Sequence, residues 1–196
     1  MMMILMLLLS VTSMASLLCI TAFEQLLSRA LLGDAEAQYK VGLCYGNADG
    51  VAQDNSAAVN WYRLSANQGN HTALNMLGVC YFKGQGVRAD YKEAIRLFRL
   101  AAERGNHHAM DNLAICYYNG CGLTADRSEA YFWALLAFIL GDILKDPVES
   151  QVKIRLDYEL DDRTRSKIKD RVDVWIDNYS SKKMEEAYNK LIYGPN

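Results

Sequence analysis

The sequence predicts an all-α fold, a solenoid of stacked helix–turn–helix units, and two observations predict it. Glycine and tyrosine recur at a fixed spacing of 36 residues; the series are Gly33, Gly69, Gly105 and Gly141; Tyr45, Tyr81 and Tyr117; and Gly50, Gly86 and Gly122. A period of this length is typical of solenoid arrays, in which each unit buries its apolar face against its neighbours. In addition, the 196 residues contain only two prolines, Pro147 and Pro195, and long stretches without proline suit helices.

Residues 1–21 are predicted to be a signal peptide or an N-terminal apolar helix. Met1 to Ile20 carries no charged side chain, and Ser13-Met14-Ala15 offers the small-x-small pattern of a signal cleavage site. The positively charged region that opens most signals is missing, apart from the amino terminus itself. A cleaved signal predicts an exported protein, periplasmic or secreted. The alternatives are a retained membrane anchor or a helix packed on the array of a cytoplasmic protein.

The first helix of each unit, helix A, is clearest in the middle copy. Asn70 can cap a helix that begins at His71, since its side chain accepts a hydrogen bond from a free amide. Leu77 and Tyr81, four residues apart, lie on one face of that helix. The equivalents of the cap are Asp34, Asn106 and Asp142. Two glycines within Gly84-Gln85-Gly86 then permit a tight turn into the second helix.

The second helix, helix B, opens at Asp90. Asp90 with Glu93, and Asp126 with Glu129, read as capping boxes. In the middle copy this helix ends at Gly105. Trp61 and Trp133 are repeat equivalents of Leu97, which indicates packing rather than ligand binding. A leading helix B precedes the first full unit, so residues 22–142 are predicted to hold a half-repeat and three full repeats.

These residues resemble the Sel1-like repeat, a relative of the tetratricopeptide repeat. The second unit carries the residues of its pattern, namely Gly69, Asn70, Ala73, Leu77, Gly78, Tyr81, Gly84, Gly86, Val87, Asp90, Ala94, Phe98, Ala101 and Ala102. The first unit departs at Ala48, where the family prefers glycine. The third departs at Ala114 and Leu123.

The resemblance implies a right-handed α-α superhelix that acts as an adaptor or scaffold and binds a peptide or protein in its concave groove. Such a protein needs no cofactor and no catalytic residue. Some secreted, cysteine-rich members of the family imply an alternative, a protein that binds or hydrolyses β-lactams. This chain lacks the second cysteine per repeat that those members use.

Residues 143–196 are predicted to be capping helices, because the repeat register fails after Asp142. Pro147 falls where a fourth helix A would be running, so the chain restarts there. The apolar spacing predicts one helix over residues 148–159 and a second, capped by Asp161, that runs to about Tyr179. A last short helix is predicted around residues 184–191. A terminal segment with a polar outer face protects the open end of a solenoid.

Composition and charge narrow the possible partners and chemistry. The formal net charge is -2, from 21 basic and 23 acidic side chains, which provides no basic field for nucleic acid. A membrane is a possible partner only if residues 1–21 are retained in the protein. Cys44, Cys80 and Cys116 are themselves repeat equivalents and are predicted to be small buried side chains, and Cys121 the most exposed thiol.

Motifs for catalysis or metal binding are weak. The sequence Ser180-Ser181-Lys182-Lys183 fits S-x-x-K, but no S-D-N or K-T-G accompanies it. His108 and Asp111, three apart, could form a relay on one helix face, although a solvated polar face explains them as well. No histidine pair has zinc-ligand spacing with further ligands. The sequence therefore predicts no catalytic residue, no metal and no cofactor.

The predicted partner surface is the side of each helix A that varies from repeat to repeat while the packing positions stay fixed. Its candidate contact residues are Tyr39, Lys40, Asn75, Met76, His108, Asp111 and Asn112. Asn75 and Asn112 are the preferred peptide contacts, because an amide side chain can pair with both backbone groups of an extended chain.

Overall fold

The computed structural model describes the backbone of residues 22–143 and 150–193, and in these ranges every regular element is a helix. The predicted all-α class is confirmed. Residues 1–21 lie outside the described residues, so their role as signal or helix stays a prediction. The chain divides into two compact units, one ending at Leu100 and the other beginning at Ala101.

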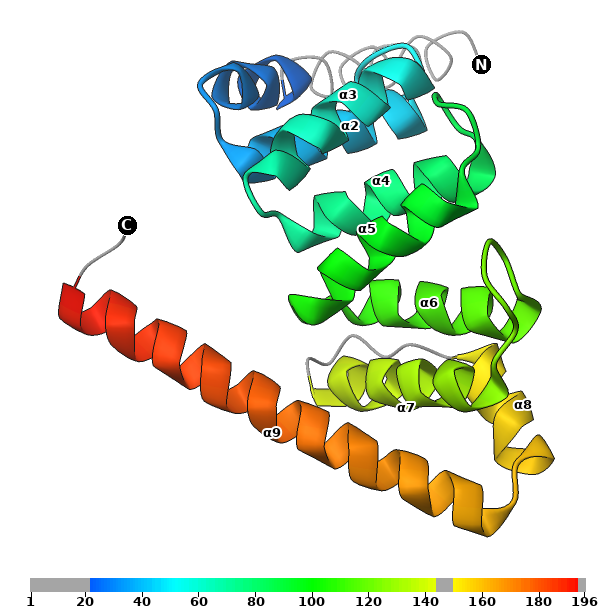
Figure 1. Cartoon of the computed structure of the whole chain (residues 1–196). Helices are drawn as coiled ribbons and strands as arrows, with labels where there is room; N and C mark the ends of the chain where they lie inside the picture. Colours follow the sequence, from blue (N-terminus) through cyan, green and yellow to red (C-terminus); the bar gives the residue numbers. More distant parts are fainter. Residues whose placement is uncertain (1–21, 144–149, 194–196) are drawn as a thin grey trace, which may run out of the picture. The chain divides into compact units, whose positions relative to one another are not determined.

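Three helix pairs follow the predicted period (Figure 1). They are α2 (Ala35–Asn47) with α3 (Asn55–Asn67), α4 (His71–Lys83) with α5 (Tyr91–Glu103), and α6 (His107–Asn119) with α7 (Arg127–Ile143). A leading helix over residues 22–31 precedes them, and α8 (Gln151–Glu159) and α9 (Asp162–Tyr193) follow.

The predicted capping residues stand at the N-terminal ends of their helices. The side-chain oxygens of Asp34, Asn70, Asn106, Asp54, Asp90 and Asp126 accept hydrogen bonds from first-turn amides at 2.8–3.1 Å. Each satisfies donors that a helix start leaves without an intrahelical partner.

The reciprocal half of the predicted capping boxes does not form. Glu93 pairs with Arg96 at 2.7 Å, while the amide of Asp90 donates to the carbonyl of Tyr81 at 3.0 Å. The equivalent bonds join Asp54 to Tyr45 and Asp126 to Tyr117. The carbonyls at the end of a helix lack intrahelical donors, so this bond satisfies both groups and closes the loop of every pair.

Within the first two pairs, the backbone of helix A meets an aromatic ring of helix B. A Cβ added to Gly42 would lie 2.5 Å from Cε1 of Tyr62, and one added to Gly78 would lie 2.6 Å from Cε1 of Phe98. The third pair replaces both partners, with Ala114 and Ala134 at the equivalent positions, and both are fully buried. A larger residue on one helix is therefore matched by a smaller one on the other.

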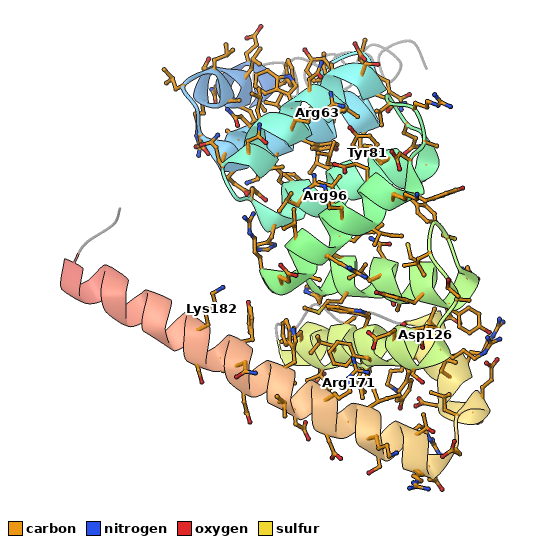
Figure 2. The ribbon with its side chains drawn as sticks, in the orientation of Figure 1. Arg63, Tyr81, Arg96, Asp126, Arg171 and Lys182 are labelled. Atoms are coloured by element: carbon orange, nitrogen blue, oxygen red, sulfur yellow. The ribbon has the colours of Figure 1, made fainter. Side chains whose placement is uncertain are left out.

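Successive pairs of the first unit are joined by backbone and polar contacts. Figure 2 shows Arg63 of α3 beside Tyr81 of α4, and its guanidinium donates to the Tyr81 hydroxyl at 3.1 Å. The loop after α4 packs on the start of α3, since a Cβ added to Gly86 would lie 2.1 Å from the carbonyl oxygen of Asn55. Only glycine fits this approach.

The second unit departs from the predicted boundaries. α7 continues through Gly141 and Asp142 to Ile143, so Asp142 caps no helix. α8 begins at Gln151, with Ser150 as its cap, rather than at residue 148. α9 is one continuous helix, and the predicted separate helix around residues 184–191 is its last part. The first glycine and proline after Asp161 are Gly194 and Pro195, so no helix-breaking residue interrupts this segment.

Two of the three repeat-equivalent cysteines are buried as predicted, whereas Cys44 is not fully buried. Cys80 and Cys116 are buried, Cys44 and Cys121 are half-buried, and all four are free thiols. Burial raises the pKa of Cys116 to about 12. In the described parts of the chain, no helix has the length and apolar character needed to cross a membrane.

We predict that Ala48→Gly stabilises the protein. Ala48 occupies the left-handed region at φ 60°, whereas Gly84 and Gly120 hold the equivalent position at φ 67° and 71°. A side chain in this region is strained, so glycine should raise the free energy of unfolding by about 0.5–1 kcal/mol. Urea unfolding followed by circular dichroism measures this. The matched control, Gly84→Ala, should destabilise; stabilisation by both variants would contradict the explanation.

We also predict that Gly78 and Phe98 are energetically coupled. Gly78→Ala should cost about 1–3 kcal/mol because its Cβ enters the Phe98 ring, and Phe98→Ala about 3–5 kcal/mol because it leaves a cavity. The double variant recreates the Ala114–Ala134 pair of the third repeat. Its cost, from the same unfolding curves, should fall below the sum of the single costs by about 1 kcal/mol or more. Simple additivity would show that the two positions are independent.

Candidate binding groove between α6 and α8

Each helix A presents one row of accessible positions. Counted from its second residue, the row follows the spacing i, i+4, i+7 and i+11, which lies on one face of a helix. We call this row the A-helix stripe. Its members, all exposed or half-buried, are Glu36, Lys40, Leu43 and Asn47 in α2; Thr72, Met76, Val79 and Lys83 in α4; and His108, Asn112, Ile115 and Asn119 in α6.

Four of the seven predicted contact residues lie on this stripe. Lys40 is exposed and pairs with Glu36 at 3.3 Å. His108 is exposed, with its ring centre 4.3 Å from that of His107. Met76 and Asn112 are half-buried. The role of these residues in partner binding stays a prediction.

The other three, Tyr39, Asn75 and Asp111, share one repeat position that faces the packing. The Tyr39 ring lies 6.2 Å from that of Tyr62, and burial raises the pKa of Tyr39. Asn75 is only 7% exposed. Oδ1 of Asp111 is buried and has no hydrogen-bond partner among the described residues. This position precedes Gly42 and its equivalents by three residues, so it lies on the face that packs against helix B. None of the three offers an exposed side chain.

A groove of about 600 Å³ opens between α6 and α8. α6 contributes Ile115 and Asn119 of its stripe together with Tyr118, and α8 contributes much of its length between Gln151 and Glu159. We call this hollow the α6–α8 groove. Two of its α8 side chains are large, apolar and accessible, with Ile154 at 43% and Tyr158 at 88% exposure.

Asp157 fixes α8 on α7 and so shapes the groove. Its Oδ1 accepts a hydrogen bond from the Tyr131 hydroxyl at 2.6 Å, and its Oδ2 accepts one from Lys153 at 2.8 Å. The Lys153 ammonium also lies 4.7 Å from the ring centre of Phe138. Burial alone would raise the pKa of Asp157, but the hydrogen bonds from Lys153 and Tyr131 outweigh it and lower that pKa. Burial, with the bond to Asp157, raises the pKa of Tyr131 to about 12.

Charged side chains surround Tyr118 at the groove. The Tyr118 hydroxyl donates to Oε1 of Glu159 at 3.2 Å and accepts from Nη1 of Arg155 at 3.3 Å. Arg127 donates to Oε2 of Glu159 at 3.1 Å. The guanidinium carbons of Arg127 and Arg155 lie 5.3 and 5.7 Å from the centre of the Tyr118 ring, within the range of cation–π attraction.

A second, smaller hollow of about 450 Å³ lies between α7 and α9. Arg171, labelled in Figure 2, lies 4.6 Å from the Phe132 ring centre and pairs with Glu129 at 2.7 Å. Trp175 lines the same hollow and stacks on Tyr179 at 5.0 Å. The charge of Arg171 is thus already paired within the chain, and Phe132 and Trp175 contribute to the contact between α7 and α9.

The described residues give no support to a catalytic or metal-binding role for the other motifs noted in the sequence. Ser180 to Lys183 fall inside α9, where Ser180 and Ser181 are exposed. The His108 ring lies 4.3 Å from that of His107, and Oδ1 of Asp111 accepts no hydrogen bond from any described residue. The described parts of the chain contain no group of three or more side chains that could hold a metal ion.

The profile of the Sel1 repeat matches residues 35–70, 71–106 and 107–142, which together make up more than half of the chain. The chain belongs to the Sel1 repeat family. Its helix pairs therefore form the solenoid repeat fold of that family, a scaffold that typically mediates protein interactions.

Two solved structures are similar to this Sel1 repeat chain. A Sel1 repeat protein from Oxalobacter formigenes is 32% identical, with a TM-score of 0.58 over 63% of this chain and 51% of that one. The c5321 protein, a protective antigen present in uropathogenic Escherichia coli strains and displaying an SLR fold, is 22% identical, with a TM-score of 0.50 over 87% of this chain and 43% of that one. This chain thus spans about half the length of each. No curated protein matches it.

Sequence reasoning missed the α8 wall of the groove. Ile154, Arg155, Tyr158 and Glu159 follow Asp142, where the repeat register ends and gives no equivalent positions to compare. The sequence shows an isoleucine and a tyrosine four residues apart with an arginine between them, but their exposure is visible only in the structure.

We predict that Asp157→Asn loosens α8 from α7. The folded pKa of Asp157 lies below its unfolded value, so its contribution is present above the unfolded pKa and disappears as the pH falls through the folded pKa. The variant should lose about 1 kcal/mol at pH 7, and the difference from wild type should shrink below about pH 4. Thermal unfolding at several pH values tests this. Asp177→Asn, an exposed carboxylate of α9, is the control, and a pH-independent difference would refute the ionic role.

Proposed function

We propose that this protein is a non-enzymatic adaptor that binds an extended segment of a partner protein on its A-helix stripes, with the α6–α8 groove as a principal contact. The observation that carries the proposal is the continuity between the two. Ile115 and Asn119 belong to the stripe of α6 and also line the groove. Because the stripe positions are exposed or half-buried in the packed pairs, recognition needs no change in the repeat joints.

The groove has the surface properties of a protein-binding site. Ile154 and Tyr158 remain accessible although they are large and apolar, and such clustered exposure marks interaction surfaces. Tyrosine offers a rigid apolar ring with a polar end, which makes it frequent among residues that dominate binding energy. Tyr118 and the surrounding charges add hydrogen-bonding groups at the same place.

The length of α8 sets the size of the bound segment. Its nine residues span about 13 Å, at 1.5 Å per residue. An extended chain covers that distance in about four residues. No feature of the described residues favours the alternative of β-lactam binding or hydrolysis.

We predict that combining Ile154→Ser with Tyr158→Ala reduces partner capture without unfolding the protein. Purified full-length chain would be used to capture proteins from a lysate of its source organism, with quantitative mass spectrometry of wild-type and variant eluates. Loss of two apolar contacts should weaken specific capture by about tenfold or more. Leu64→Ser, an exposed apolar residue of α3 at 48% exposure, is the matched control. Equal capture by wild type and the double variant would remove the groove from the contact surface.

A further inference from the structure

We propose that the α6–α8 groove selects segments in which an Asp or Glu side chain stands next to a large apolar side chain, and that Arg155 reads the carboxylate. This inference rests on the proposed function and gives the chemical class of the partner. The acidic residue is internal to the segment rather than a free carboxyl terminus.

Arg155 is the guanidinium available for this role. It is exposed and lies at the fifth of the nine positions of α8. Within the described residues it forms no ion pair, and its hydrogen bond is the donation from Nη1 to the Tyr118 hydroxyl. A guanidinium carries five donors in a planar fork, so Nε and Nη2 remain for a carboxylate.

The neighbouring groups compensate the positive charge of Arg155 only in part. Glu159 attracts Arg155 electrostatically but forms no ion pair with it, because its Oε2 accepts from Arg127 and its Oε1 from the Tyr118 hydroxyl. Two guanidinium groups therefore share one carboxylate. Asp157 is paired with Lys153. Tyr118 also restrains the Arg155 side chain from two directions, through its hydroxyl and its ring. A restrained, unpaired cation at an apolar groove favours an anionic group on the ligand.

The apolar side chains around Arg155 define the rest of the ligand. Ile154 and Tyr158 lie one residue before and three residues after it on α8, and Ile115 lies on the opposite wall. An extended segment places successive side chains on opposite sides, so an acidic residue at Arg155 brings its neighbours toward these apolar groups. Because Arg155 is central in α8, chain continues on both sides of the carboxylate.

The test is fluorescence anisotropy with the full 196-residue chain and defined peptide pools. The first pool contains labelled hexapeptides with blocked ends, a central Glu and Leu or Phe on both sides. The second replaces Glu by Gln, the third replaces it by Lys, and the fourth carries Gln with a free terminal carboxylate. The variants are Arg155→Ala and Arg155→Glu. Arg88→Ala, an exposed arginine in the loop before α5, is the matched control, and circular dichroism melting verifies folding.

We expect the Glu pool to bind wild type about 10- to 100-fold more tightly than the Gln pool, and this preference to weaken with added salt. Arg155→Ala should abolish the preference, Arg155→Glu should shift it to the Lys pool, and Arg88→Ala should leave it unchanged. Equal binding of the Glu and Gln pools, binding of the free-carboxylate pool alone, or no binding of any pool would overturn the inference. The proposed function is judged separately, by the capture experiment with the Ile154 and Tyr158 variants.

Discussion

The rest of the structure depends on the close approach of the two helices in each repeat. In the first two pairs a glycine of helix A lies against an aromatic ring of helix B, and the third pair meets the same spatial demand with two alanines. Packing at this distance fixes the rotation of helix A about its own axis. The rotation in turn decides which positions are buried and which form the accessible stripe.

This constraint explains why two adjacent positions of helix A have different environments, although the residue type varies among the repeats at both. Tyr39, Asn75 and Asp111 differ in chemistry, as surface positions do, yet they lie three residues before the packing glycine or alanine and turn toward helix B. Asn75 is buried, the Tyr39 ring lies against Tyr62, and Oδ1 of Asp111 is buried. Lys40, Met76 and Asn112, one residue further, reach the accessible side. Variation among repeats therefore indicates tolerance at a position but does not by itself indicate exposure.

The repeats, their caps and the glycine turns could be predicted from the sequence. Residues close together in the chain determine each of these features, and each motif occurs in three successive repeats. The capping-box exchange was wrong for a tertiary reason, since the carbonyls of Tyr45, Tyr81 and Tyr117 lie within reach of the cap amides. The α8 wall could not be predicted. Its position depends on Asp157 meeting Tyr131 across 26 residues, and no second copy of that contact exists in the described chain to reveal it.

The end of a solenoid is also where its surface is least constrained. A helix inside the array must match a neighbour on both sides. α8 instead packs on α7 and on α6, and it meets α9 where Arg165 donates to the carbonyl of Asp157 at 2.8 Å. Val152 and Leu156 lie on its packed side and are buried. The opposite side of α8 carries Ile154, Arg155 and Tyr158. None of the stripes of α2, α4 and α6 combines an arginine with two exposed apolar side chains in this way. The same short helix thus packs against the last repeat with one side and presents a mixed charged and apolar surface with the other.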